Sequence, residues 1–182
     1  AGETTGSVTF DNPNSEDVYI DNSTETYTIT GTTGGNYVSL DTSDQSNVII
    51  NDTIDTSTVT LSSVGSGDED GATVTYTATF TTAPTQDETV SFKVDGVDYS
   101  ITVKAGELTG KTTLTYKNKD VIVDPTEIPV ATDLDITNNS NYDDLTAVNS
   151  STKFDVADSI DITKINVTAE NSTDGKNIIL NV

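Results

Sequence analysis

The sequence predicts an all-β protein built from tandem immunoglobulin-like β-sandwich modules of about 105 residues each. Thr, Val and Ile are abundant, and Gly, Asn, Asp and Ser mark the breaks, which is the chemistry of strands and turns. We find no sustained helical periodicity. The module length comes from a repeat: the run NDTIDTSTVTL at 51–61 returns as ADSIDITKINV at 157–167, and AGETTG at 1–6 returns as AGELTG at 105–110. The offsets, 106 and 104 residues, indicate one repeating unit.

The repeat divides the chain into three parts. Residues 1–55 are expected to hold the C-terminal strands E to G of one module, 56–162 a complete module, and 163–182 the first strands A and B of a following module. Three strands alone are marginally stable. The partial modules are therefore either completed by another copy of the chain or are a slice of a longer protein, and the sequence leaves both open.

Each strand of the complete module is predicted from alternation of apolar and polar residues, as in 72–80, where Val74, Tyr76, Ala78 and Phe80 alternate with threonines. The dipeptide Asp95-Gly96 predicts a two-residue hairpin turn. No helix is visible that could connect parallel strands in one sheet. The predicted strands, in the order A, B, C, a hairpin return, E, F and G, are 58–63, 72–80, 89–95, 98–104, 111–116, 129–136 and 152–156. In the partial modules we predict strands at 7–10, 26–30, 47–51, 164–168 and 176–182.

The composition restricts the partners and the chemistry. Thirty acidic residues against eight basic ones give a net charge of −22, which repels nucleic acid and anionic membrane surfaces. Cys and His are absent, so disulfides are impossible, zinc and copper are disfavoured, and the commonest catalytic bases and nucleophiles are missing. No apolar run is long enough to span a membrane, and the start does not resemble a signal peptide. We therefore expect no enzyme, no membrane insertion, and a segment that is internal to a larger chain or already processed.

The acidic residues are predicted to gather where modules meet. In a seven-strand sandwich of this order, the A–B loop, the E–F loop and the end of strand G share one pole, and the B–C and F–G loops share the other. Convergent carboxylates are destabilising unless something neutralises them, and calcium accepts six to eight oxygen ligands in irregular loops. The predicted Ca²⁺ ligands are Asp17, Asp21, Asp52, Asp55, Asp68, Glu69, Asp70, Asp87, Asp120, Asp124, Asp143, Asp144, Asp158, Asp161 and Asp174.

Four points remain open for individual residues. One alternative for any single Asp is that it only shapes a turn and faces water. Asp52 and Asp55 share an ion only if the chain bends between them, because residues three apart in a strand point to opposite faces. Tyr142, next to Asp143, is either a core residue or part of a sugar-binding surface, and glycosylation of the Asn-x-Ser/Thr triplets is undecided.

The run at 51–61 resembles the module boundary of giant bacterial RTX adhesins, which are repeat proteins exported by type I secretion. The run ATVTYTAT at 72–79, the AGExTG motif and the DVYID loop at 17–21 fit the same family. Two departures are a longer, more acidic A–B loop and Lys119 in the position of Glu16. The Gly/Asp nonapeptides of the RTX secretion region are also absent.

This resemblance implies an extracellular protein at the bacterial cell surface, made of calcium-rigidified extender modules that hold a distal ligand-binding domain away from the cell. Its partners would be neighbouring repeats of the same chain. The matching acids that the resemblance implies as calcium ligands are Asp17, Asp21, Asp52, Asp55, Asp120, Asp124, Asp158 and Asp161. The alternatives are a sugar- or protein-binding module, and an S-layer or fibre subunit whose strands are completed between chains.

Overall fold

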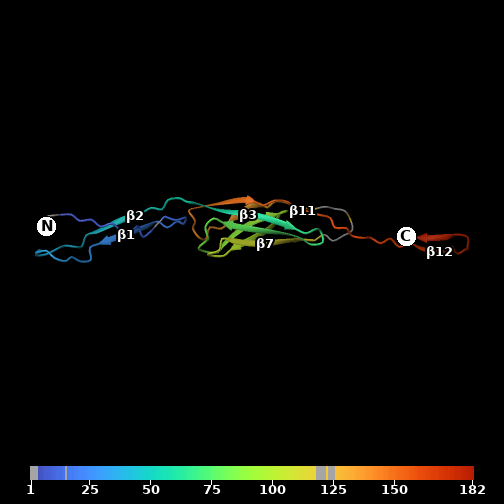
Figure 1. Ribbon diagram of the computed structural model, residues 1–182, viewed down its shortest axis with the longest axis horizontal. Helices are drawn as coiled ribbons and strands as arrows, with labels where there is room; N and C mark the ends of the chain where they lie inside the picture. Colours follow the sequence, from blue (N-terminus) through green and yellow to red (C-terminus); the bar gives the residue numbers. More distant parts are fainter. Residues whose placement is uncertain (1–3, 15, 118–121, 123–125) are drawn as a thin grey trace.

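The computed structural model describes residues 4–14, 16–117, 122 and 126–182. These residues form thirteen strands and no helix, which confirms the all-β class. No helix capable of spanning a membrane occurs in this part of the chain. The molecule is long and thin, with a packed sandwich in the middle and one isolated strand pair toward each end (Figure 1). The two chain termini therefore lie toward opposite ends of the molecule.

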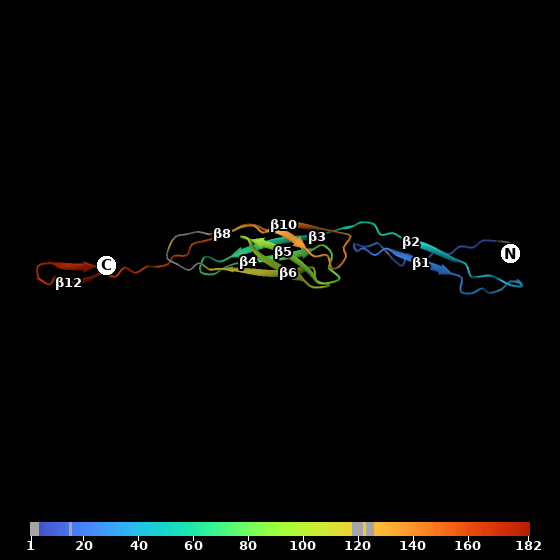
Figure 2. The same ribbon diagram turned by 180° about the vertical axis from the view of Figure 1, so that it is seen from behind.

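Two sheets pack face to face in the central sandwich. Strand β10 runs parallel to β3, whereas the other pairs in both sheets are antiparallel. Figure 2 shows β10 beside β3 from behind. The first sheet has the order β10 (Asp144–Ser150), β3 (Thr56–Ser66), β4 (Ala72–Phe80), β7 (Thr109–Tyr116). The second has the order β6 (Val97–Val103), β5 (Glu88–Val94), β9 (Thr132–Ile136).

Three further sheets have two strands each. They pair β1 (Ser23–Thr28) with β2 (Gln45–Ile50), β8 (Thr126–Ile128) with β11 (Phe154–Val156), and β12 (Thr168–Asn171) with β13 (Ile178–Asn181). The β8–β11 pair lies at one end of the sandwich, and the other two pairs lie outside it (Figure 1).

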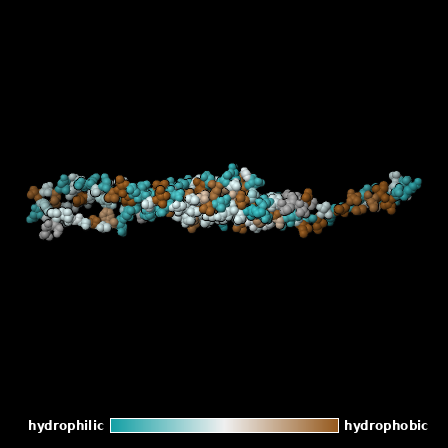
Figure 3. Space-filling view, turned by 90° about the horizontal axis from the view of Figure 1, so that it is seen from above, coloured by the Kyte–Doolittle hydropathy of each residue, from teal (hydrophilic) through white to brown (hydrophobic). Residues whose placement is uncertain are grey.

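The hydrophobic core lies entirely within the sandwich. Among the described residues, every buried hydrophobic side chain falls between Val59 and Val156. Alternate residues of β4 and β5 point inward, and the rings of Tyr76 and Phe92 meet at 4.9 Å between the sheets. This burial of period two is what the alternation at 72–80 predicts. The long brown and teal surface in Figure 3 shows that hydrophobic side chains are, by contrast, exposed toward the ends.

Most predicted strands of the complete module are confirmed, and β4 has the predicted bounds. The turn at Asp95-Gly96 is also confirmed, since both residues have the positive φ angles, 50° and 75°, of a two-residue hairpin turn. Strand G, predicted at 152–156, is confirmed in part by β11, which covers Phe154–Val156. The prediction missed β10, whose first residue, Asp144, was expected in the F–G loop.

Strand β10 escaped prediction because most of its side chains are exposed and it carries no clear alternation. It is held by backbone pairing to β3, a partner more than eighty positions away in sequence. Strand F is likewise divided, into β8 and β9. The strand predicted at 7–10 does not form. The strand predicted at 164–168 starts later, at Thr168, as β12.

Two tyrosine hydroxyls in the core provide a matched test of the packing. The buried hydroxyl of Tyr76 has no hydrogen-bond partner among the residues that the structure describes, whereas that of Tyr142 donates to the carbonyl oxygen of Thr82 at 2.8 Å. We expect Tyr76→Phe to raise the free energy of unfolding by about 1 kcal/mol, and Tyr142→Phe to lower it by about 1–2 kcal/mol. Urea unfolding of both variants checks this, and a loss of stability in Tyr76→Phe would contradict the packing described.

Candidate functional site

The N-terminal part meets the sandwich at what we call the junction, which comprises residues 16–22, 51–56 and 138–144. The backbone crosses it as a short antiparallel bridge between Tyr19 and Tyr142. The amide of Ile20 donates to the carbonyl of Asn141 at 2.8 Å, and the amide of Asp143 donates to the carbonyl of Val18 at 3.0 Å. The loop at 17–21 thus adds a strand-like segment to the F–G loop of the sandwich.

Tyr19 fastens this bridge to the core. Its hydroxyl donates to the carbonyl oxygen of Ala83 at 2.6 Å, and its ring lies 4.9 Å from that of Tyr142. Tyr142 is fully buried and also stacks on Phe80, with centroids 6.1 Å apart. Burial, helped by the hydrogen bond with Tyr19, raises the pKa of Tyr142 above its ordinary value. Tyr142 is therefore a core residue, and the sugar-binding alternative for it is wrong.

A pair of carboxyl groups lies beside the bridge. Partial burial, a hydrogen bond with Asp143 and the negative charges of Asp143, Asp21 and Glu16 together raise the pKa of Asp52 to about 6. Two carboxyl groups can hydrogen bond only when one of them carries a proton. Below about pH 6, Asp52 therefore carries the proton of this hydrogen bond, and above it the pair becomes negatively charged.

Further hydrogen bonds lie near this pair, and most of them have a carboxylate as the acceptor. One of them, from the amide of Asp55 to Asp143, joins the N-terminal part to the sandwich. The bonds join Thr53 to Glu16, the amide of Asp52 to Asn22 at 2.9 Å, the amide of Asp55 to Asp143 at 3.4 Å, Thr56 to Asp144 at 2.9 Å, and Asn14 to Asp21 at 3.3 Å. A small hollow of about 30 Å³ opens among Asn12, Asn14, Glu16, Asp21, Ile50, Asn51 and Asp52.

The donor chemistry at the junction fits a hard cation. Glu16, Asp21, Asp52 and Asp143 offer only oxygen atoms, which calcium and magnesium prefer. In the arrangement described, however, no three acidic side chains among residues 4–14, 16–117, 122 and 126–182 form a group that could hold a metal ion. Binding would therefore need the carboxylates to draw closer than they lie here.

Three other predicted ligands are bonded within their own surroundings. Asp87 pairs with Lys104 at 2.6 Å, and this hydrogen bond, with that from the amide of Ala105, lowers the pKa of Asp87. Asp174 accepts hydrogen bonds from the Ser172 hydroxyl and the Lys176 amide, which lower the pKa of Asp174. Asp17 accepts the amide of Tyr19 at 2.8 Å. Each of these carboxylates shapes its turn.

The opposite pole of the sandwich brings together the A–B loop and the segment after β11, as predicted. Glu69 is buried and accepts two hydrogen bonds from Ser159, from its amide and its hydroxyl, both at 3.0 Å. Asp68 forms a parallel bridge with Ala157. Asp70 is exposed, whereas Asp158 and Asp161 are half-buried. The predicted ligands Asp120 and Asp124 lie outside the described residues.

Sequence reasoning missed three residues that hold the loops at the junction. Glu16 and Tyr19 lie in the quoted loop motif but were not chosen as site residues. Glu88 is fully buried and accepts hydrogen bonds from the Ser140 amide at 2.7 Å and the Thr137 hydroxyl at 2.8 Å. A signal for Glu88 existed, because it shares the inward period of Val90 and Phe92 along β5.

The comparison with protein families places the chain in a family. A model of the family described as "LapA domain" matches residues 1–53 and 55–159. The break between the two matched stretches falls at residue 54, inside the junction. Neither the curated proteins nor the solved structures gave a match.

The Asp52–Asp143 pair predicts a specific pH dependence. Because the pKa of Asp52 is raised to about 6 in the folded junction, its stabilising contribution is complete below about pH 4 and is lost as the pH rises through about 6. In the absence of divalent ions, carboxyl ¹³C NMR should show Asp52 titrating near pH 6. Asp143→Asn should lower that midpoint, whereas Asp55→Asn should leave it in place. A midpoint near the ordinary value in the unaltered chain would contradict the pairing.

Proposed function

Since this chain belongs to the LapA domain family, a non-enzymatic family of large surface adhesins, we propose that it is a calcium-rigidified extender segment of a cell-surface adhesin. In this role, the segment projects a distal ligand-binding domain from the bacterial cell into the extracellular medium. Residues 1–55, 56–162 and 163–182 then belong to three successive modules, and the partners of each module are its neighbours along the chain.

The observation that carries the proposal is the junction itself. A flexible linker would leave the partial module free to swing, but here the backbone bridge between Tyr19 and Tyr142 and the Tyr19 hydroxyl tie it to the sandwich. A tied junction sets the direction of one module relative to the next. Figure 1 shows the N-terminal part and the sandwich end to end along the long axis, and a series of such junctions would give an extended spacer.

The negative charge at the junction is the reason to propose a calcium ion there. Above about pH 6 the proton on Asp52 is lost, and the carboxylates of Asp52 and Asp143 then repel each other. A bound calcium ion supplies positive charge and accepts several carboxylate oxygens at once. Glu16, Asp21, Asp52 and Asp143 are the residues we propose to hold it. The half-buried acids of the other pole, Asp158 and Asp161, are proposed for the following junction.

The linkage between calcium and docking follows from mass action. An ion that binds only the docked junction stabilises it by about 1.4 kcal/mol when its concentration is ten times the dissociation constant. Extracellular calcium modules typically bind with constants of about 10⁻⁴ to 10⁻³ M. The docking of the N-terminal part on the sandwich would therefore depend on calcium at millimolar concentration, which is found outside cells and not inside them.

Isothermal titration with calcium tests the proposal. We expect binding at pH 7.5 with a dissociation constant of about 10⁻⁴ to 10⁻³ M, and a rise of several degrees in the melting temperature. The double variant Asp52→Asn with Asp143→Asn should lose a binding event.

The matched control is Asp98→Asn with Asp135→Asn, which removes the same charge from exposed positions on the second sheet. Its calcium binding should equal that of the unaltered chain. An equal loss of calcium binding in both double variants would mean that calcium binding depends only on the net charge of the chain. If the unaltered chain does not bind calcium, the calcium part of the proposal is overturned.

A further inference from the structure

The chain leaves the sandwich through residues 157–161, which we call the exit segment. This segment follows β11 and leads toward the C-terminal strand pair (Figure 1). Its residues belong to none of the thirteen strands, and a connection of this kind is mobile unless contacts outside it hold it in place. Here the A–B loop of the sandwich, residues 67–71, holds the exit segment at two successive points.

The first point of attachment is a backbone contact. Asp68 forms a parallel bridge with Ala157, and the amide of Glu69 donates to the carbonyl oxygen of Ala157 at 3.0 Å. The loop presents these groups because it turns tightly, with the amide of Gly71 donating to the carbonyl oxygen of Asp68 at 3.0 Å. Gly67 has a φ of 96°, and a Cβ atom there would lie 2.9 Å from the carbonyl oxygen of Gly71, so the turn requires glycine.

The second point of attachment is the side chain of Glu69. One carboxylate oxygen, Oε1, accepts both the amide and the hydroxyl of Ser159, each at 3.0 Å. Glu69 is only 4% exposed, so water competes little for these bonds, and a charged acceptor makes them stronger than bonds between neutral groups. Ile160, the next residue, is 95% exposed, so packing of its side chain does not hold the segment. Glu69 thus holds the exit segment at its middle residue.

A contact of the same kind occurs one repeat earlier. Thr53 lies 106 positions before Ser159, and each follows its strand, β2 or β11, at the third position. The hydroxyl of Thr53 donates to the carboxylate of Glu16, which belongs to the part of the chain that the segment at 51–55 leaves. Glu16 and Glu69 come from different loops. What recurs is therefore a hydroxyl on the connecting segment that is held by a glutamate of the module behind it.

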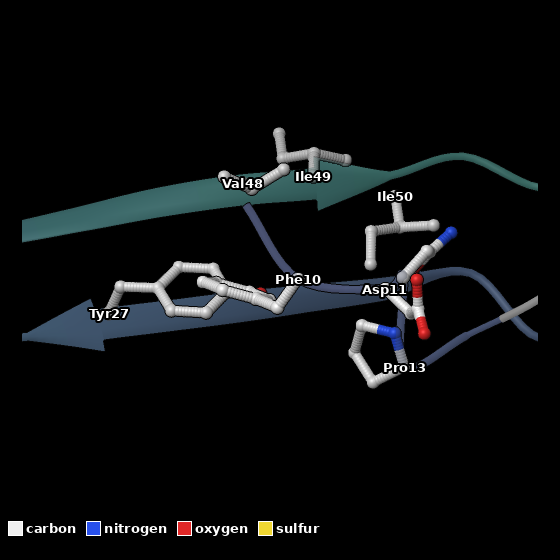
Figure 4. A pocket seen from close by; sticks show the side chains of 8 residues that line it. Phe10, Asp11, Pro13, Tyr27, Val48, Ile49 and Ile50 are labelled. Carbon is white, nitrogen blue, oxygen red and sulfur yellow. The ribbon is translucent and has the colours of Figure 1, made fainter. Parts of the chain in front are cut away.

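Two further contacts fix the earlier segment to the part that it leaves. Figure 4 shows Ile50, the last residue of β2, beside Asp11 and Pro13, and all three side chains line one groove. Two residues later, the amide of Asp52 donates to the side-chain oxygen of Asn22 at 2.9 Å. At both places the connecting segment is thus bonded to the module behind it.

We propose that Glu69 is a positioning residue that fixes the direction in which the chain leaves the sandwich, and that it does so without calcium. Its Oε1 is already occupied by the two donors of Ser159. Loss of calcium then lets the chain bend beyond Ile160, whereas residues 157–160 stay with the sandwich. The proposal rests on the modular part of the proposed function, because an exit direction matters where modules are joined in a row.

Amide hydrogen exchange tests this contact directly. In the unaltered chain, the Ser159 amide should be protected both with calcium and in chelator. Glu69→Ala should speed its exchange by about ten- to a hundredfold, the range expected for loss of a hydrogen bond to a charged acceptor. Glu69→Gln keeps an acceptor oxygen and should cause a smaller increase. The matched control is Glu107→Ala, which removes an exposed glutamate of the sandwich and should cause none.

Three results of this experiment would overturn the proposal. One is a Ser159 amide that is protected with calcium but not in chelator, which would leave the calcium proposal intact. Another is an equal increase in Glu69→Gln and Glu69→Ala, because the charge of Glu69 would then matter as it does for a cation ligand. The third is unchanged exchange in Glu69→Ala. Conversely, a protected Ser159 amide in a chain that binds no calcium would refute only the calcium part of the proposed function.

Variants of Ser159 provide a second test that leaves buried Glu69 in place. Ser159→Ala removes the hydroxyl donor, whereas Ser159→Thr keeps it, as Thr53 does at the equivalent position. Spin labels on cysteines at the exposed positions Ile160 and Thr113 report the distance between the exit segment and the sandwich. In chelator, we expect a narrow distance distribution for the unaltered chain and Ser159→Thr, and a broader one for Ser159→Ala. Equal breadth in the two variants would overturn the proposal.

Discussion

Repulsion between carboxylates is the constraint on which the module junction depends. The chain carries a net charge of −22, and at the junction the negative charges of Asp143, Asp21 and Glu16 act on the carboxyl group of Asp52. What opposes the repulsion is a short backbone bridge, the Tyr19 hydroxyl on the carbonyl of Ala83, and a shared proton between Asp52 and Asp143. The backbone bridge and the Tyr19 hydrogen bond do not depend on pH. The proton on Asp52 is lost above about pH 6, so the stability of the junction depends on pH.

The stability of the molecule is correspondingly uneven. The sandwich has alternating inward side chains on both sheets and a continuous core, with buried Glu69 and Glu88 holding the loops at its two ends. The terminal pairs repeat the registers of sandwich strands but expose the side chains that the sandwich buries. Identical strand pairing with opposite burial shows that local sequence sets the register, while neighbouring strands supply most of the stabilisation.

The same distinction explains how far sequence alone could predict this structure. The bounds of β4 and the turn at Asp95 and Gly96 follow from local alternation and backbone preference, and both were predicted. The approach of Asp143 to Asp52 was also predicted, because it follows from strand order. Strand β10 was missed because its stabilising partner, β3, is distant in sequence and its own side chains carry little pattern. The Asp87–Lys104 ion pair and the docking of Tyr19 depend on side-chain geometry that no local motif specifies.

The central claim is that Tyr19 and the carboxylates together hold neighbouring modules in one orientation, and a distance measurement across the junction tests it most directly. Spin labels on cysteines at the exposed positions Thr24 and Thr113 report the distance between the N-terminal pair and the sandwich. With calcium at pH 7.5, the account predicts a narrow distribution that broadens on chelation. Tyr19→Ala should broaden it even with calcium, and Tyr37→Ala, at an exposed tyrosine of the same segment, should not. A distribution equally narrow in chelator and in Tyr19→Ala would contradict the account.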